Sequence, residues 1–140
     1  MKNEVKDNMD TIIRKPKVHT FPFAIAYADT DAAGIVYHAR YLEIAERARM
    51  DWLKYSMPPV GDLGFVIKEI TVKYLRALRA GDEITVETIA TNIGAASVSV
   101  EQKMMKDGVI YAILTGTAAY LGANMKPKRI PERIITKITE

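Results

Sequence analysis

Four residues able to support chemistry stand close together, directly ahead of a helical pattern. They are Asp29, Asp31, Gly34 and His38, in the stretch YADTDAAGIVYHARYLEIAERARMDWL. A carboxylate on a loop can attack a carbonyl carbon or activate a water molecule to do so. The free N–H groups at a helix N-terminus can stabilise the oxyanion that forms. This combination suits acyl transfer to water, and either aspartate could supply the carboxylate.

Each of these residues also has an ordinary structural role. Aspartate and threonine, as in Asp29-Thr30-Asp31, often cap helices, because their side chains accept hydrogen bonds from free backbone N–H groups. Gly34 suits a turn with positive φ. His38 is a common type of surface residue that can also exchange a proton near neutral pH. The spacing by itself is compatible with both interpretations.

Several other chemistries are excluded or disfavoured by the residues present. The chain has no cysteine, so disulfides, thiolate metal sites and a cysteine nucleophile are excluded. It has no GxSxG motif and no glycine-rich phosphate loop. The two histidines, His19 and His38, disfavour a histidine-rich metal centre, so we expect no metal site.

The composition is that of one compact globular domain. The 140 residues are 49% hydrophobic and 26% charged, with a net charge of +3. Lysine and arginine are spread along the chain except near the C-terminus, which disfavours nucleic-acid binding. No apolar run is long enough for a membrane span, and the charged N-terminus lacks the apolar core of a signal peptide. We therefore expect a cytoplasmic protein.

The periodicity of apolar residues predicts an α+β fold. Residues 1–17 are polar and predict a flexible arm, followed by a single domain at 18–140. A strand begins at Val18, and Pro22 places it at a sheet edge. A helix is expected over 38–55, with Tyr41, Leu42, Ala45, Ala48, Trp52 and Leu53 on its buried face.

The rest of the chain alternates in the manner of strands. Strands are expected within 65–78, 83–93, 97–105 and 109–121, with a hairpin turn at Lys106-Asp107-Gly108 and a short helix from Pro131. The helix at 38–55 should cover one face of an antiparallel sheet. The other face is expected to carry Val, Ile and Tyr side chains, which predicts self-association.

The stretch YADTDAAGIVYHARYLEIAERAR resembles the signature of the hot-dog-fold 4-hydroxybenzoyl-CoA thioesterase family. It is most similar to the bacterial acyl-CoA thioesterases associated with the Tol-Pal system. Further matches are ITVKYLRALRAGDEITVET and NMKPKRIP, so the resemblance spans residues 21–131. It implies a long central helix wrapped by a five-stranded antiparallel sheet. It also implies homodimers or homotetramers with active sites at the dimer interface.

The resemblance also implies roles for individual residues. Asp31 matches the catalytic carboxylate, as nucleophile or general base, and Asp29 orders the loop. The backbone N–H groups around Tyr37 and His38 would hold the thioester oxygen, with the His38 side chain positioning the thioester or the water. Gly34 would allow close approach of the substrate. Ala32 and Ala33 replace bulkier or proline residues of some relatives, which bears on pocket shape.

The implied substrate is an acyl-CoA, and coenzyme A is part of that substrate, so no separate cofactor is expected. Basic residues at Arg76, Lys126, Lys128 and Arg129, with Arg79, would bind its phosphates. Tyr41, Trp52 and Phe65 are candidates to line an acyl slot, although each fits a plain core position better.

Alternative functions on the same fold are a dehydratase of hydroxyacyl thioesters and a non-catalytic acyl-CoA or acyl-carrier binding module. The thioesterase motif is closer to this sequence than the histidine-and-carboxylate pattern of the dehydratases. For a thioesterase, the sequence leaves three choices open. The acyl group can be aryl or aliphatic, the carrier can be CoA or an acyl-carrier protein, and the assembly can be a dimer or a tetramer.

Overall fold

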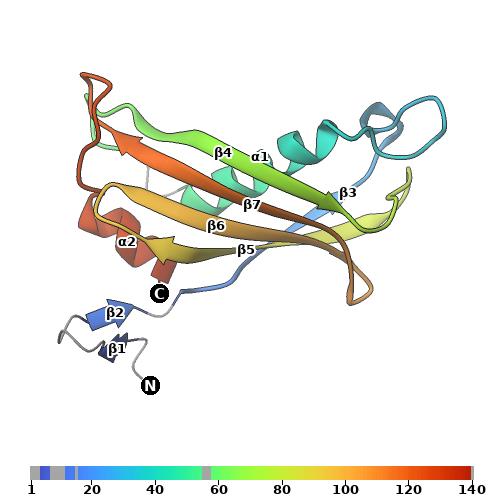
Figure 1. The fold of residues 1–140 in the computed structure, drawn as a ribbon. Helices are drawn as coiled ribbons and strands as arrows, with labels where there is room; N and C mark the ends of the chain where they lie inside the picture. The colour runs from blue at the N-terminus through green and yellow to red at the C-terminus, as the bar shows by residue number, and fades with distance from the viewer. Residues whose placement is uncertain (1–3, 7–11, 15, 55–57, 140) are drawn as a thin grey trace.

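The computed structural model describes residues 4–6, 12–14, 16–54 and 58–139. Its main body is a five-stranded antiparallel sheet with two helices on one face (Figure 1). The strands are β3 (His19–Ala24), β4 (Gly64–Tyr74), β5 (Glu83–Ile93), β6 (Ser97–Lys106) and β7 (Val109–Leu121). The helices are α1 (Arg40–Leu53) and α2 (Glu132–Thr139), and a 3-10 turn, η1 (Tyr27–Asp29), precedes α1. The predicted α+β class and five-stranded sheet are confirmed.

The N-terminal arm contains two short strands of its own. β1 (Glu4–Lys6) and β2 (Ile12–Arg14) pair antiparallel as a separate two-stranded sheet beside the main body (Figure 1). The sequence did not predict these strands. The flexibility expected for residues 1–17 stays a prediction, as does the assignment of 18–140 to a single domain.

The strands of the main sheet lie in the order β3-β5-β6-β7-β4, so β3 and β4 form its two edges. The edge position predicted from Pro22 is therefore confirmed, since proline has no N–H to donate to a second neighbour. The β6–β7 hairpin also forms as predicted. Asp107 and Gly108 both have positive φ, 51° and 75°, which is the backbone of a type I′ turn.

Helix α1 buries one stripe of side chains against the sheet. Its buried residues are Tyr41, Ile44, Ala45, Ala48 and Trp52. The sequence missed Ile44 and wrongly assigned Leu42, which is 37% exposed. The helix has 14 residues, about 21 Å, and is shorter than the expected 38–55. Tyr55 lies outside the described residues. No helix among the described residues is long and apolar enough to cross a membrane.

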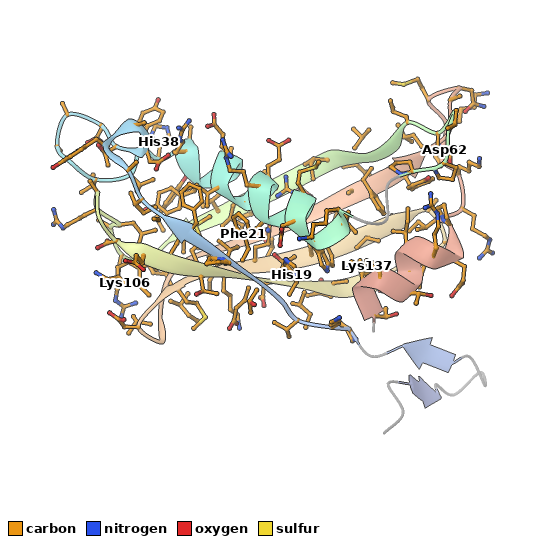
Figure 2. All side chains as sticks on the ribbon, turned by 180° about the vertical axis from the view of Figure 1, so that it is seen from behind. His19, Phe21, His38, Asp62, Lys106 and Lys137 are labelled. Carbon is orange, nitrogen blue, oxygen red and sulfur yellow. The ribbon has the colours of Figure 1, made fainter. Side chains whose placement is uncertain are left out.

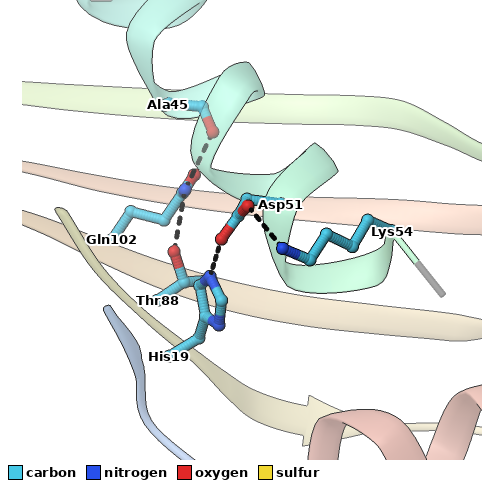
Figure 3. A network of polar contacts seen from close by, with 6 residues as sticks. All are labelled: His19, Ala45, Asp51, Lys54, Thr88 and Gln102. Atoms are coloured by element: carbon cyan, nitrogen blue, oxygen red, sulfur yellow. Dashed lines mark hydrogen bonds and ion pairs between the residues drawn. The ribbon is translucent and has the colours of Figure 1, made fainter. Parts of the chain in front are cut away.

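Polar contacts also fasten α1 to the sheet (Figure 3). Gln102 is buried on β6, and its Nε2 donates hydrogen bonds to the Ala45 carbonyl at 3.0 Å and to Thr88 Oγ1 at 3.1 Å. Closer to the end of α1, His19 Nε2 lies 2.8 Å from Asp51 Oδ2. The hydrogen bonds of Gln102 and Thr88 satisfy buried polar groups, which is the condition for keeping them in a core.

The sheet face turned away from the helices is more polar than expected. A shallow depression at its centre is lined mostly by hydroxyl and carboxylate side chains: Glu69, Thr71, Thr91, Ser99, Glu101, Thr115 and Thr117. The Val, Ile and Tyr side chains expected on this face therefore do not dominate this part of the sheet, and self-association stays a prediction. Exposed apolar side chains gather instead along β4, as Val66, Ile67 and Tyr74, with Leu63 and Leu75 at its ends.

Candidate functional site

The loop between β3 and α1 is held in place by Asp29. This residue is 6% exposed, and its carboxylate accepts hydrogen bonds from the Ala26 N–H and from Arg40 Nε, both at 2.8 Å. The ion pair raises the pKa of Arg40, whose guanidinium also contacts Glu43. The Asp29 carbonyl accepts the Tyr37 N–H at 3.0 Å. Asp29 thus fixes both ends of the loop, as the sequence predicted.

Asp31 stands on this fixed loop and is exposed. Its Oδ1 accepts the Ala33 N–H at 2.8 Å, and its own N–H donates to the Ile35 carbonyl at 2.9 Å. The loop is tied in turn to the β4–β5 connection, because the Val36 N–H donates to the Leu78 carbonyl at 2.8 Å. Among the described residues, Oδ2 of Asp31 has no hydrogen-bond partner. One carboxylate oxygen is therefore anchored while the other is available.

His38 lies in the turn just before α1, which begins at Arg40. Its carbonyl accepts a hydrogen bond from the Tyr74 hydroxyl at 2.6 Å, so the edge strand β4 holds this turn. The Tyr74 ring also meets Tyr41 edge to face, with 5.0 Å between ring centroids. In the described part of the chain no carbonyl accepts the His38 N–H. This amide is therefore open at the start of the helix.

A cavity of about 400 Å³ brings these groups together. Asp31 and His38 line it from the loop, Tyr41 from α1, and Tyr74 and Arg76 from the end of β4. Arg76 donates from Nη1 to the Ile110 carbonyl at 2.8 Å, which holds the cation near the mouth of the cavity. Asp31, His38 and Arg76 thus border one space.

Two other predicted site residues lie beside the cavity but do not line it. Tyr37 is half exposed, and its ring centroid is 4.4 Å from that of His38. Its N–H already donates to the Asp29 carbonyl, so this amide is occupied, whereas the His38 amide has no backbone acceptor among the described residues. Gly34 has φ of +81° and no atom within 4 Å of a Cβ placed on it. The turn geometry expected of Gly34 is present.

The basic residues of the C-terminal segment lie at the opposite end of the molecule. Lys128 Nζ is 2.7 Å from Oδ1 of Asp62, and Figure 2 shows Asp62 and His38 at the two ends of the long axis. Oδ2 of Asp62 accepts the hydroxyl of the buried Tyr120 at 2.8 Å. Lys126 and Arg129 are exposed beside Lys128. Within one chain, therefore, Arg76 is near Asp31 and this C-terminal group is not.

Tyr120→Phe is expected to change stability in a pH-dependent way. Burial, and then the hydrogen bond to Asp62, raise the pKa of Tyr120 to about 12, against roughly 10 in an unfolded chain. Because the folded pKa is the higher, this stabilisation is complete below about pH 10 and is lost as pH rises through about 12. The variant should lose about 1–2 kcal/mol at about pH 8, since Asp62 loses a donor. Urea unfolding should show the difference shrinking above about pH 10.

A second cavity, of about 180 Å³, lies between the C-terminal half of α1 and the sheet. Trp52 and Phe65 line it, whereas Tyr41 lines the first cavity. Tyr41 and Trp52 are also 3% and 4% exposed. The candidate acyl-slot residues therefore do not line one slot: Tyr41 borders the first cavity, and Trp52 and Phe65 border the second. Tyr41 and Trp52 are also core residues.

Sequence reasoning missed two contributors to the site. Tyr74 was assigned only to a strand, and Arg40, within the expected helix, was given no role. Both act through contacts with residues more than ten positions away: Tyr74 with the His38 carbonyl and Arg40 with Asp29. A period-2 or period-3.6 pattern carries no signal for such contacts, because it reports only which face an element buries.

The fold belongs to a known class of protein. The chain belongs to the thioesterase-like superfamily, because the sequence model of that family matches residues 25–138. It has the hot-dog fold of that superfamily. It is 33% identical over 122 residues to the acyl-CoA thioesterase YbgC of Haemophilus influenzae, covering 82% of this chain and 90% of that protein.

Solved structures show the same fold. A thioesterase from Thermus thermophilus, complexed with coenzyme A and Zn, is 26% identical with a TM-score of 0.77, covering 89% of this chain and 99% of the other. The 1,4-dihydroxy-2-naphthoyl-CoA thioesterase Slr0204 from Synechocystis is 20% identical with a TM-score of 0.79, covering 87% and 96%. In this chain, no group of three His, Asp or Glu side chains within the described ranges is arranged to hold a metal ion.

Proposed function

We propose that this chain hydrolyses acyl-CoA thioesters to a free acid and coenzyme A. The single observation that carries the proposal is the cavity shared by Asp31, His38 and Arg76. The 33% identity to an acyl-CoA thioesterase over most of both chains supports the same reaction. We place the chain, as a proposal, in the 4-hydroxybenzoyl-CoA thioesterase family and its Tol-Pal-associated subgroup.

The proposed mechanism uses one carboxylate and one amide. Asp31 either adds to the thioester carbonyl carbon or removes a proton from a water molecule that adds there. The carbonyl oxygen takes up negative charge and accepts a hydrogen bond from the His38 N–H. The C–S bond then breaks, and the CoA thiolate leaves and is protonated. In the general-base route the added water becomes part of the free acid; in the nucleophile route a water molecule hydrolyses the acyl-Asp31 anhydride, which releases the acid and restores the carboxylate. A thioester carbonyl is activated enough for these groups, so we propose that no separate cofactor takes part.

We propose that the active unit is a homodimer paired through β4. This edge strand has 11 residues with exposed Val66, Ile67 and Tyr74, whereas the other edge, β3, contains Pro22. Two copies of β4 related by a two-fold axis run antiparallel. Phe65 and Ile67 of one copy then lie beside residues 71–74 of the other.

This pairing accounts for the position of the C-terminal basic residues. Asp62 and Lys128 lie near the start of β4, and Tyr74 and Arg76 near its end. In the antiparallel dimer the start of one β4 faces the end of the other. Lys126, Lys128 and Arg129 of the partner subunit therefore approach the Asp31 cavity and can bind CoA phosphates. Gly34, without a side chain, leaves room for the substrate at the loop.

Removing two of these charges should weaken binding more than turnover. We expect Lys126→Gln with Arg129→Gln to raise KM for acyl-CoA about tenfold, with kcat little changed, because phosphate contacts are the same in ground and transition states. Lys128→Gln should be measured separately, since it also removes the partner of Asp62. Lys103→Gln, on β6, is the control. An unchanged KM in the double variant would mean that this segment does not bind the phosphates.

The function itself is tested with a panel of acyl-CoAs and a thiol reagent. We expect release of free CoA from at least one compact acyl-CoA, and none from a control without enzyme. Absence of release from every substrate, with an acyl-CoA bound in native mass spectrometry, would instead identify a binding module. Acyl-carrier-protein thioesters in the same assay determine which carrier is used.

Three further expectations belong to this proposal. We propose that α1 serves as the central helix of the hot-dog domain at 18–140, with residues 1–17 as a flexible arm. We also propose a cytoplasmic location, with which a sequence without cysteine is consistent. A tetramer, formed from two such dimers, is the larger assembly to look for by light scattering.

A further inference from the structure

The turn that precedes α1 is anchored by backbone hydrogen bonds on both sides of His38. On the loop side, the Tyr37 N–H donates to the Asp29 carbonyl at 3.0 Å. On the helix side, the Arg40 N–H donates to the Tyr37 carbonyl at 2.8 Å. In the described part of the chain no backbone N–H donates to the His38 carbonyl itself. The orientation of this carbonyl is therefore not set by the backbone.

A side chain from β4 supplies the contact that orients this carbonyl. The Tyr74 hydroxyl donates to the His38 carbonyl at 2.6 Å, although the two residues are 36 positions apart in the sequence. A peptide plane between two anchored neighbours can rotate about its ends, because φ and ψ are the soft dihedrals of the backbone. Since the peptide unit is planar, a hydrogen bond to its oxygen fixes the whole plane that joins residues 38 and 39. Tyr74 thus selects one orientation of the turn.

Tyr74 is itself held from two directions. Its backbone ends β4 and pairs with Ala112 of β7, and its ring meets the buried Tyr41 edge to face, with 5.0 Å between ring centroids. Two residues further on, Arg76 is tied to the same strand β7, because its Nη1 donates to the Ile110 carbonyl at 2.8 Å. Although Tyr74 is 49% exposed, its hydroxyl therefore reaches the turn from a fixed point.

Asp31 is fixed by contacts other than this hydroxyl. Its N–H and its Oδ1 are bonded within the loop, and the loop is tied to the β4–β5 connection by the Val36 N–H, which donates to the Leu78 carbonyl at 2.8 Å. The carboxylate and the His38 turn thus line one cavity but depend on separate contacts. Loss of the Tyr74 hydroxyl should displace the turn and leave the carboxylate in place. A misplacement of about 1 Å between reacting groups can lower a rate about 100-fold.

We propose that Tyr74 is a positioning residue for thioester hydrolysis, and that it acts through the His38 carbonyl to hold the turn in the correct place relative to Asp31. The inference rests on the proposed thioesterase function and adds a residue that the mechanism above does not use. Tyr74 does not serve as a general acid in this role. A hydroxyl has one hydrogen, and that of Tyr74 is donated to the His38 carbonyl rather than to the leaving thiolate.

Tyr74→Phe removes the hydroxyl and keeps the ring that packs on Tyr41. We expect kcat for acyl-CoA hydrolysis to fall about 10- to 100-fold and KM to change by less than about threefold, because the turn is displaced while the substrate contacts stay. Tyr111→Phe is the matched control, since it removes a hydroxyl from β7 outside the cavity lining, and it should keep normal kcat and KM. A normal kcat in Tyr74→Phe would overturn the proposal. A raised KM at normal kcat would do so too, because it would indicate direct contact with the substrate.

Hydrogen exchange follows the turn itself rather than the reaction. In Tyr74→Phe, the amides of residues 36–42 should exchange about tenfold faster than in the unmodified protein, because a contact that holds the turn is lost. The same amides should exchange at the normal rate in Tyr111→Phe. A fall in kcat with unchanged exchange at residues 36–42 would show that Tyr74 does not act through the turn, and would overturn the proposal.

A rescue experiment assigns the effect to the hydrogen bond. Replacement of Tyr74 by p-aminophenylalanine restores a donor at the same point of the ring and should return most of the lost kcat. A folded p-aminophenylalanine protein with low kcat would overturn the proposal, and this outcome is decisive even if Tyr74→Phe fails to fold. Hydrolysis of no acyl-CoA by the unmodified protein would overturn the thioesterase function and the role of Tyr74 together. Equal hydrolysis by the unmodified protein and Tyr74→Phe would overturn the role of Tyr74 alone.

Discussion

Replacing Asp31 with Asn is expected to lower kcat for acyl-CoA hydrolysis by about 10²–10⁴-fold, the range for loss of a group acting on a proton in the transition state. The amide has the same shape as the carboxylate, and its oxygen can still accept the Ala33 N–H. Asp31 is exposed, so the fold should keep its stability. KM should change little, because the carboxylate acts in the transition state rather than in binding. Release of CoA measured with a thiol reagent gives both constants.

Asp107→Asn provides a matched control for this experiment. Asp107 lies in the β6–β7 hairpin with φ of 51°, a conformation that asparagine also tolerates. The control removes the same charge without touching the cavity, so its kcat should equal that of the unmodified protein. Near-normal turnover in Asp31→Asn, with the melting temperature preserved, would remove Asp31 from the mechanism.

Replacing Ile67 with Lys is expected to dissociate the dimer and, at the same time, to remove most of the turnover. Ile67 is 42% exposed on β4, where the proposed two-fold axis brings two copies of the strand together. Because Ile67 of one copy lies beside residues 71–74 of the other, each substitution would place an unpaired charge in an apolar contact, which costs several kcal/mol. The dissociation constant should rise about 100-fold or more, which corresponds to about 2.7 kcal/mol. Turnover should fall in parallel, because each site needs both subunits.

Val109→Lys is the control for the Ile67 variant. Val109 is exposed to a similar extent, 41%, but lies at the start of β7 in the hairpin, away from the β4 edge. Sedimentation across a range of protein concentrations should give a dimer for the control and a monomer for the β4 variant. A monomer with full specific activity would refute the shared site. A stable Ile67→Lys dimer would show that β4 is not the contact.

The sequence alone was enough to determine the features of this protein that depend on near neighbours. The type I′ turn at Asp107 and Gly108, the alternation in β5, β6 and β7, and the edge position of Pro22 all follow from local backbone preferences and side-chain periodicity. The sequence likewise predicted that Asp31 and His38 lie just ahead of a helix, because loop and helix are adjacent in the chain. The strands β1 and β2 were missed, since a short polar segment has no such period.

Only the tertiary structure decided which distant residues meet. Although β3 and β4 are opposite edges of the sheet, the fold brings the end of β4 beside the loop of Asp31, so that Tyr74 and Arg76 join this cavity. Lys128 binds Asp62 at the far end. It also decided that Ile44 rather than Leu42 faces the sheet. The physical reason is that strand pairing and helix docking are settled by the packing of whole faces, and a local pattern does not record which faces meet.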